Sequence, residues 1–97
     1  MPGLAADDVV EIPARIDREG AHPLPLEPLP QELLELVSRV KTYERLAVRA
    51  AVTGDPVLAR AALAANPLAG GSEMAAQLFD AIVETNRQWL PRFAPVA

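Results

Sequence analysis

The start of the fold is decided by residues 9–26, which read Val9-Val10-Glu11-Ile12-Pro13-Ala14-Arg15-Ile16-Asp17-Arg18-Glu19-Gly20-Ala21-His22-Pro23-Leu24-Pro25-Leu26. Apolar and polar side chains alternate in residues 9–16, and a period of two is typical of a half-buried strand. Pro13 has no amide hydrogen to give to a sheet ladder, so the strand lies at a sheet edge or breaks there. One strand leaves its backbone groups unpaired. We therefore expect its sheet partner in a second copy or in a part of the polypeptide outside this chain.

The segment that follows the polar turn at residues 17–20 is a proline-rich strap, residues 22–30. Its prolines fix φ and remove backbone donors, so the segment is extended. We expect Leu24, Leu26 and Leu29 to anchor the strap on the chain's own core. The alternative is a proline-rich ligand for an aromatic groove of another protein. Leucines at every second or third position favour the first interpretation.

From Pro30 the apolar period becomes helical, and Pro30 suits a first helical position. Gly54 is a natural end for this long helix, Asp55 a cap for the next one, and Pro56 its first residue. The short second helix ends by Asn66-Pro67. The apolar stripe of the first helix comprises Leu33, Leu36, Val37, Val40, Tyr43, Ala47, Ala50 and Ala51.

A third helix follows Gly70-Gly71, with Ser72 as its expected cap and Pro91 as its end. Its apolar face places Phe79 and Trp89 on one stripe, which indicates core packing for both, although aromatic side chains here could also anchor an interface. The sequence therefore predicts an α+β fold that is mostly α. A short N-terminal strand and the strap (residues 1–30) precede three helices, two long and one short (residues 31–97), in a single domain of residues 1–97.

Composition excludes several classes of function. The 97 residues suffice for one small domain, and the net charge of −4 gives no basic footprint for nucleic acid. The absence of cysteine excludes disulfides and zinc–sulfur sites. No apolar run approaches the roughly 18–20 residues that cross a bilayer, and no signal peptide is present, so we expect a cytoplasmic protein without membrane contacts.

Few residues are candidates for chemistry. His22 is the only histidine, and a lone histidine beside proline is more often packed or solvated than catalytic. Lys41, Arg45 and Arg49 recur at every fourth position and form a basic stripe. Such a stripe can hold a phosphate or an acidic partner, but it is more often the solvated flank of a helix.

Several of these stretches, in their order and spacing, resemble the C-terminal domain of the family 4 glycoside hydrolases, closest to the 6-phospho-β-glucosidase branch. They are Asp17-x-x-Gly20-x-His22-Pro23-Leu24-Pro25, Tyr43-Glu44-Arg45-Leu46, Val48-x-Ala50-Ala51-x-x-Gly54-Asp55, Asn66-Pro67-Leu68 and Asn86-x-x-x-Leu90-Pro91. Arg49 departs from the resemblance, because the family usually has an acidic residue there, and so does the Ala69-Gly70-Gly71 link.

The resemblance implies the C-terminal domain of a lactate-dehydrogenase-like enzyme that hydrolyses phosphorylated glucosides with NAD and a divalent metal, typically manganese. It places the nucleotide loop, the metal ligands and the catalytic base upstream, so no catalytic, cofactor-binding or metal residue is expected in this chain. His22 would lie on a strap that faces the active site. The partners implied are the N-terminal NAD-binding half, which this chain lacks, and further copies in a homo-oligomer.

Two functions follow as expectations. The first is the C-terminal domain of a 6-phospho-β-glucosidase, here without the catalytic half and therefore inactive alone. The alternative is a stand-alone helical module that self-associates or binds a full-length relative.

Overall fold

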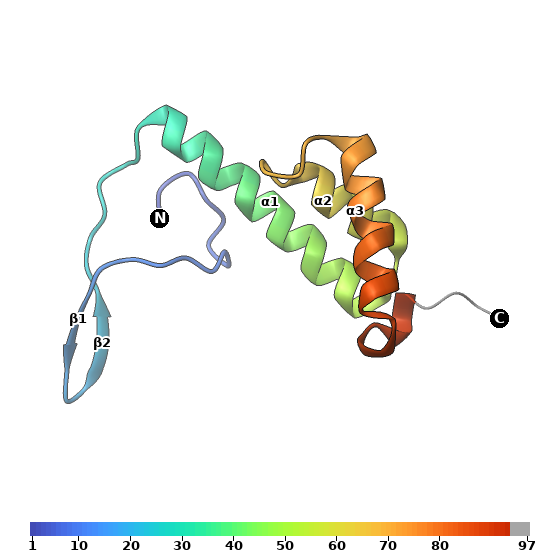
Figure 1. Ribbon diagram of the computed structural model, residues 1–97. Coiled ribbons are helices and arrows are strands. Elements are labelled where there is room, and N and C mark those ends of the chain that lie inside the picture. Colours follow the sequence, from blue (N-terminus) through green and yellow to red (C-terminus); the bar gives the residue numbers. More distant parts are fainter. Residues whose placement is uncertain (94–97) are drawn as a thin grey trace. The chain divides into compact units, whose positions relative to one another are not determined.

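The computed structural model describes residues 1–93 of the chain (Figure 1). It confirms an α+β fold that is mostly helical, with two long helices and one short one. In chain order the elements are β1 (Ala14–Asp17), β2 (Gly20–Pro23), α1 (Gln31–Thr53), α2 (Pro56–Ala65), α3 (Ser72–Thr85) and the 3-10 helices η1 (Arg87–Trp89) and η2 (Pro91–Phe93).

The chain divides into two compact units, Met1–Glu35 and Leu36–Ala97, with the boundary inside α1. The first unit holds the hairpin and the strap, and the second holds most of the helical part. The single-domain prediction for residues 1–97 stays a prediction. Within residues 1–93, no helix has both the length and the apolar character that crossing a membrane requires.

The predicted strand finds its partner inside the chain, so the expectation of a partner elsewhere was wrong. β1 and β2 form a two-stranded antiparallel sheet with Asp17 opposite Gly20. Only residues 14–16 of the predicted strand lie in the sheet, and β1 also includes Asp17 of the predicted turn. The strand begins directly after Pro13, which has no amide hydrogen to give to a sheet ladder. The ladder goes one step further, because the amide of Leu24 donates to the carbonyl oxygen of Pro13 at 3.0 Å.

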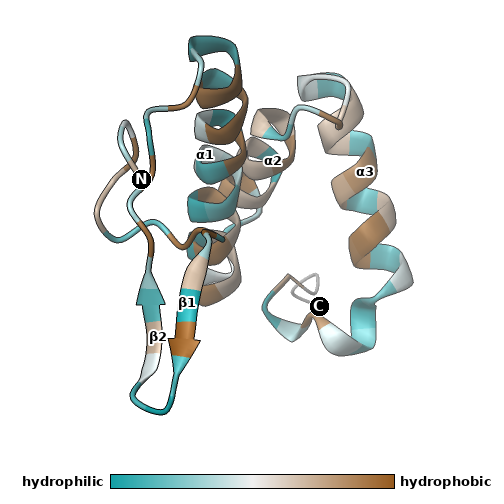
Figure 2. Ribbon diagram, turned by 90° about the vertical axis from the view of Figure 1, so that its left-hand side faces the viewer, coloured by the Kyte–Doolittle hydropathy of each residue, from teal (hydrophilic) through white to brown (hydrophobic). Residues whose placement is uncertain are grey.

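The first unit has no hydrophobic core of its own, because none of residues 1–35 is buried. Ile16 on β1 is 72% exposed. In the strap, Leu26 and Leu29 are half-buried, whereas Leu24 is 45% exposed and the prediction that it acts as an anchor was wrong. Figure 2 shows the hydrophilic hairpin turn next to the apolar end of β1.

The junction between α1 and α2 is confirmed residue by residue. The amide of Gly54 donates to the carbonyl oxygen of Ala50 at 2.8 Å, and its φ of +73° is the left-handed conformation that ends many helices with glycine. A carboxylate oxygen of Asp55 then accepts from the amide of Val57 at 2.8 Å, with Pro56 as the first residue of α2.

The ends of α3 differ from the prediction. Gly71, with φ +99°, precedes the helix as its cap, and Ser72 is the first helical residue and not the cap. The helix ends at Thr85, and Asn86 follows as its C-cap with a non-helical φ of −111°. The backbone and side-chain amides of Asn86 both donate to the carbonyl oxygen of Ile82. The expected continuation to Pro91 is replaced by the two 3-10 helices.

The core lies in the second unit, where α2 packs against α3. Its buried residues are few and small: Ala50, Ala62, Ala69, Ala75 and Phe79. The core prediction is confirmed for Phe79, which is 8% exposed, and was wrong for Trp89, which is 74% exposed. Four alanines and one phenylalanine bury little apolar area, so the second unit gains little hydrophobic stabilisation from its own residues.

Candidate functional site

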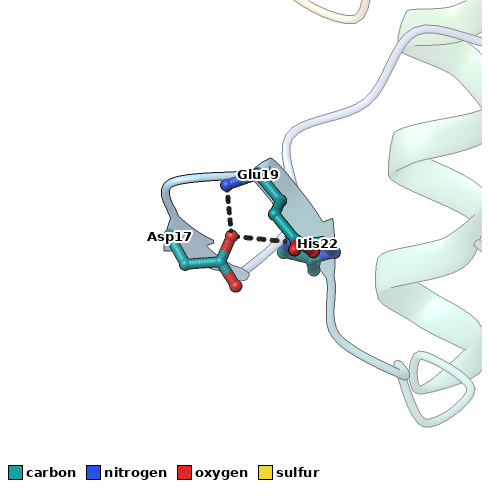
Figure 3. A group of neighbouring side chains, drawn as sticks. All are labelled: Asp17, Glu19 and His22. Atoms are coloured by element: carbon teal, nitrogen blue, oxygen red, sulfur yellow. Dashed lines mark hydrogen bonds and ion pairs between the residues drawn. The ribbon is translucent and has the colours of Figure 1, made fainter.

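His22 lies in a small cluster on the hairpin (Figure 3). Its Nε2 is 3.0 Å from Oδ1 of Asp17, and the same oxygen accepts from the backbone amide of Glu19 at 2.8 Å. The second oxygen of Asp17 accepts from the Arg15 guanidinium at 3.1 Å. An aspartate that accepts from the amide two residues later is a common way to stabilise a tight turn. The cluster therefore fixes the two-residue connection between β1 and β2.

The cluster also has donor atoms of the kinds that bind a metal. One ligand atom from each of Asp17, Glu19 and His22 lies within 4.8 Å of the others. However, both oxygens of Asp17 already accept hydrogen bonds, and the Arg15 cation contacts the carboxylate that a metal would need. The side chains are also open to solvent, with 39% exposure for His22 and 34% for Asp17. The arrangement is that of a stabilised turn.

The basic stripe lies on α1 in the second unit, and its members differ from one another. The Lys41 ammonium group donates to a Glu44 carboxylate oxygen at 2.6 Å, and the Lys41 side chain is only 12% exposed. Arg45 and Arg49 are exposed. Lys41 is therefore mostly covered, whereas the side chains of the two arginines are in contact with solvent. Anion binding by Lys41, Arg45 and Arg49 stays a prediction.

Arg92 was not among the residues predicted from the sequence, and its side chain caps the C-terminus of α1. Its guanidinium donates to the carbonyl oxygen of Ala51 at 3.0 Å and also to that of Val52. These are two of the last carbonyls of α1, which have no partner within the helix. Gly54 permits the contact, since a Cβ at this position would lie 2.8 Å from the Cβ of Arg92 and 2.9 Å from its carbonyl oxygen.

A hollow of about 510 Å³ lies next to the contact between Gly54 and Arg92. Its lining includes three arginines, Arg60, Arg87 and Arg92. Each is already engaged. Arg60 pairs with Asp80 at 3.2 Å and lies 4.7 Å from the centre of the Phe79 ring, and Arg87 pairs with Glu84. The two carboxylates offset most of the positive charge, so the hollow has a mixed charged lining and not an anion site.

The hairpin, the strap and the helices with a small alanine-rich core make an α+β fold, and comparison with known proteins places the chain in a family. The model of the "Family 4 glycosyl hydrolase C-terminal domain" matches residues 1–69. The chain belongs to this family.

Curated relatives agree with the assignment. The chain is 36% identical over 93 residues to a probable 6-phospho-β-glucosidase of Bacillus subtilis, a match that covers 96% of the chain and 21% of the relative. It is 32% identical over 97 residues to an α-galactosidase of Rhizobium meliloti, covering 97% of the chain and 20% of the relative. It is 33% identical over 90 residues to the 6-phospho-β-glucosidase BglT of Thermotoga maritima, covering 93% and 22%. The chain therefore spans about a fifth of the length of these relatives.

Proposed function

We propose that this chain forms the C-terminal domain of a 6-phospho-β-glucosidase and supports the hydrolysis of phosphorylated glucosides without carrying out the chemistry itself. One structural observation supports this role most strongly: residues 1–35 contain no buried residue, and residues 36–93 bury only four alanines and Phe79. A domain with so little core gains stability by covering its apolar surface with another part of the protein. In the proposed enzyme that part is the NAD-binding half.

The described residues do not fit NAD. A dinucleotide binds where a parallel strand turns into a helix through a glycine-rich loop. Here the two strands are antiparallel and are joined by Arg18 and Glu19. NAD, which supplies reversible hydride transfer, is therefore assigned to the rest of the enzyme.

Manganese does not fit either. Its best candidate ligand, Asp17, is committed to the hairpin turn and to the Arg15 guanidinium. The metal is also assigned to the rest of the enzyme, and the proposal includes a cytoplasmic homo-oligomer to which the helices of this domain contribute contacts.

The choice of substrate comes from the relatives. Two of the three are described as 6-phospho-β-glucosidases, although the third is described as an α-galactosidase. The 36% identity to the Bacillus subtilis protein makes it a suitable host for a test. The stand-alone interaction module is the competing function, and it predicts that the chain contributes nothing when it is placed in an enzyme.

The test is a chimera in which this chain replaces the matching C-terminal stretch of the Bacillus subtilis relative. The chimera, the chain alone and the host ending before the replaced stretch are assayed with a chromogenic 6-phospho-β-glucoside, NAD, Mn²⁺ and a reductant. We expect turnover by the chimera and none by the other two. Turnover by the chain alone, or a folded chimera without turnover, would contradict the proposal.

A further inference from the structure

The second unit contains an apolar groove that its own residues leave open. The groove has a volume of about 300 Å³, and Tyr43 provides the only polar side-chain group in its lining. α1, α2, α3 and η2 contribute to it, together with Leu90 between the two 3-10 helices. The lining residues are Tyr43, Ala47, Ala50, Ala51, Ala59, Ala62, Leu63, Phe79, Ile82, Val83, Leu90 and Phe93.

The floor and the rim of the groove differ in exposure. Ala50, Ala62 and Phe79 are buried at 3%, 2% and 8% exposure, whereas Ile82 at the rim is 43% exposed and Ala51 is exposed. Small side chains on the floor allow a partner helix to approach closely, and the larger rim residues can pack on both of its sides. A groove of this kind suits a helix that presents leucine, isoleucine, valine or phenylalanine side chains.

A charged border lies next to the groove. The hollow of about 510 Å³ shares Phe79, Val83 and Phe93 with the groove, so the two adjoin. The side chains of Arg60, Asp80, Glu84 and Arg87 line that hollow. An apolar centre beside a charged, solvent-exposed rim is the usual composition of a protein interface.

We propose that the apolar groove receives the apolar face of a helix contributed by the part of the enzyme that precedes this domain. This inference rests on the proposed function. The chain spans about a fifth of its relatives, so a whole protein of that length supplies the remaining four-fifths as a covalently linked source of such a helix.

A second copy of the chain is a poorer occupant. In a two-fold dimer the same surface of each copy forms the interface. A two-fold axis through the groove would therefore place one concave groove opposite another, and neither would fill the other. A covalently linked partner also acts at a high effective concentration, so it requires less intrinsic affinity than a separate copy.

Cysteine labelling can test the occupant, because the chain has no cysteine of its own. Ile82→Cys and Ala51→Cys place thiols on the groove rim from α3 and α1, at positions already exposed. Gln77→Cys is the matched control, an exposed α3 position that does not line the groove. Each variant is made in the isolated chain and in the chimera, and its reaction rate with N-ethylmaleimide is corrected by the rate of the chimera without the new thiol.

We expect both rim thiols to react about tenfold or more slowly in the chimera than in the isolated chain, with little change at the control position. Circular dichroism of the isolated variants shows whether each one folds. Two rim positions are used so that one rim thiol can still be measured if the other variant does not fold.

Equal rim rates in a chimera that is active would overturn the groove proposal and leave the proposed function intact. A folded chimera without turnover would overturn both, because the groove proposal rests on the proposed function. Rim protection in the isolated chain that rises with concentration, together with a dimer in sedimentation velocity, would assign the groove to a second copy and overturn the proposal.

Discussion

The Arg92 guanidinium donates a hydrogen bond to the carbonyl oxygen of Ala51 at 3.0 Å, across 41 positions of sequence. It thereby joins η2 to the end of α1 and satisfies carbonyls that the helix itself leaves without a partner. A positive charge at a helix C-terminus also interacts favourably with the helix dipole.

Arg92→Ala should therefore lower the free energy of unfolding of the chain by about 1 kcal/mol, as expected for a charge-assisted hydrogen bond at an exposed position. Arg87→Ala is the control, since Arg87 pairs with the exposed Glu84 one turn away. Its loss should cost less than about 0.5 kcal/mol. Urea unfolding followed by circular dichroism measures both, and equal losses would count against the role of Arg92.

Gly54→Ala should destabilise the chain more than Gly70→Ala. The two glycines have nearly the same φ, +73° and +76°, so the conformational cost of an alanine is similar. A Cβ at Gly54 would lie 2.9 Å from the carbonyl oxygen of Arg92, whereas at Gly70 its nearest neighbour is the Met74 side chain at 3.4 Å. The clash should add roughly 1–3 kcal/mol at Gly54. Thermal melts of the two variants measure the difference between their losses of stability. Equal losses would contradict the prediction, because they would show that only the backbone conformation matters.

Phe79→Ala should have the largest effect in the second unit. Phe79 is the only large side chain among the buried residues of the described part of the chain, and it contacts the Phe93 ring edge-to-face at 5.7 Å. Its truncation should cost about 3–5 kcal/mol, which is enough to unfold a domain with so small a core.

Trp89→Ala is the control for Phe79→Ala, since Trp89 is 74% exposed and its loss should change stability by less than about 0.5 kcal/mol. We expect Phe79→Ala to lose its helical circular dichroism signal at 25 °C and Trp89→Ala to retain it. Comparable melting temperatures for the two variants would show that the core lies elsewhere.

Asp17→Ala should open the hairpin turn without affecting the helices. The Asp17 carboxylate is the acceptor for the Glu19 amide and for the side chains of Arg15 and His22. We expect the Glu19 amide to exchange its hydrogen about tenfold faster, while the α2 and α3 amides keep their rates. Asp17→Asn retains an oxygen for the Glu19 amide and should preserve most of its protection. NMR exchange measurements that show no change at Glu19 in Asp17→Ala would contradict the turn assignment.

The parts of the fold that depend on local sequence could be predicted. Gly54, Asp55 and Pro56 end one helix and begin the next through their own backbone preferences and a hydrogen bond that spans two residues. The family resemblance was also visible in the sequence, because it depends on the order and spacing of motifs.

The missed features depend on weak or distant signals. β2 is Gly-Ala-His-Pro, which lacks the β-branched and aromatic residues typical of strands, so the hairpin could not be expected from propensity. The backbone of Asn86 leaves the helical conformation with a φ of −111°, so Trp89 does not continue the apolar stripe that an uninterrupted helix would have. The contact between Arg92 and Ala51 joins residues 41 positions apart, and no local pattern indicates it.

The central claim is that this domain completes its small core by contact with the rest of a family 4 enzyme. Hydrogen–deuterium exchange of residues 36–93, compared between the isolated chain and the Bacillus subtilis chimera, tests it most directly. The account predicts that peptides from α1, α2 and α3 exchange at least about tenfold more slowly in the chimera. Equal exchange in both proteins would contradict the claim, because the domain would then be as stable alone as in the enzyme.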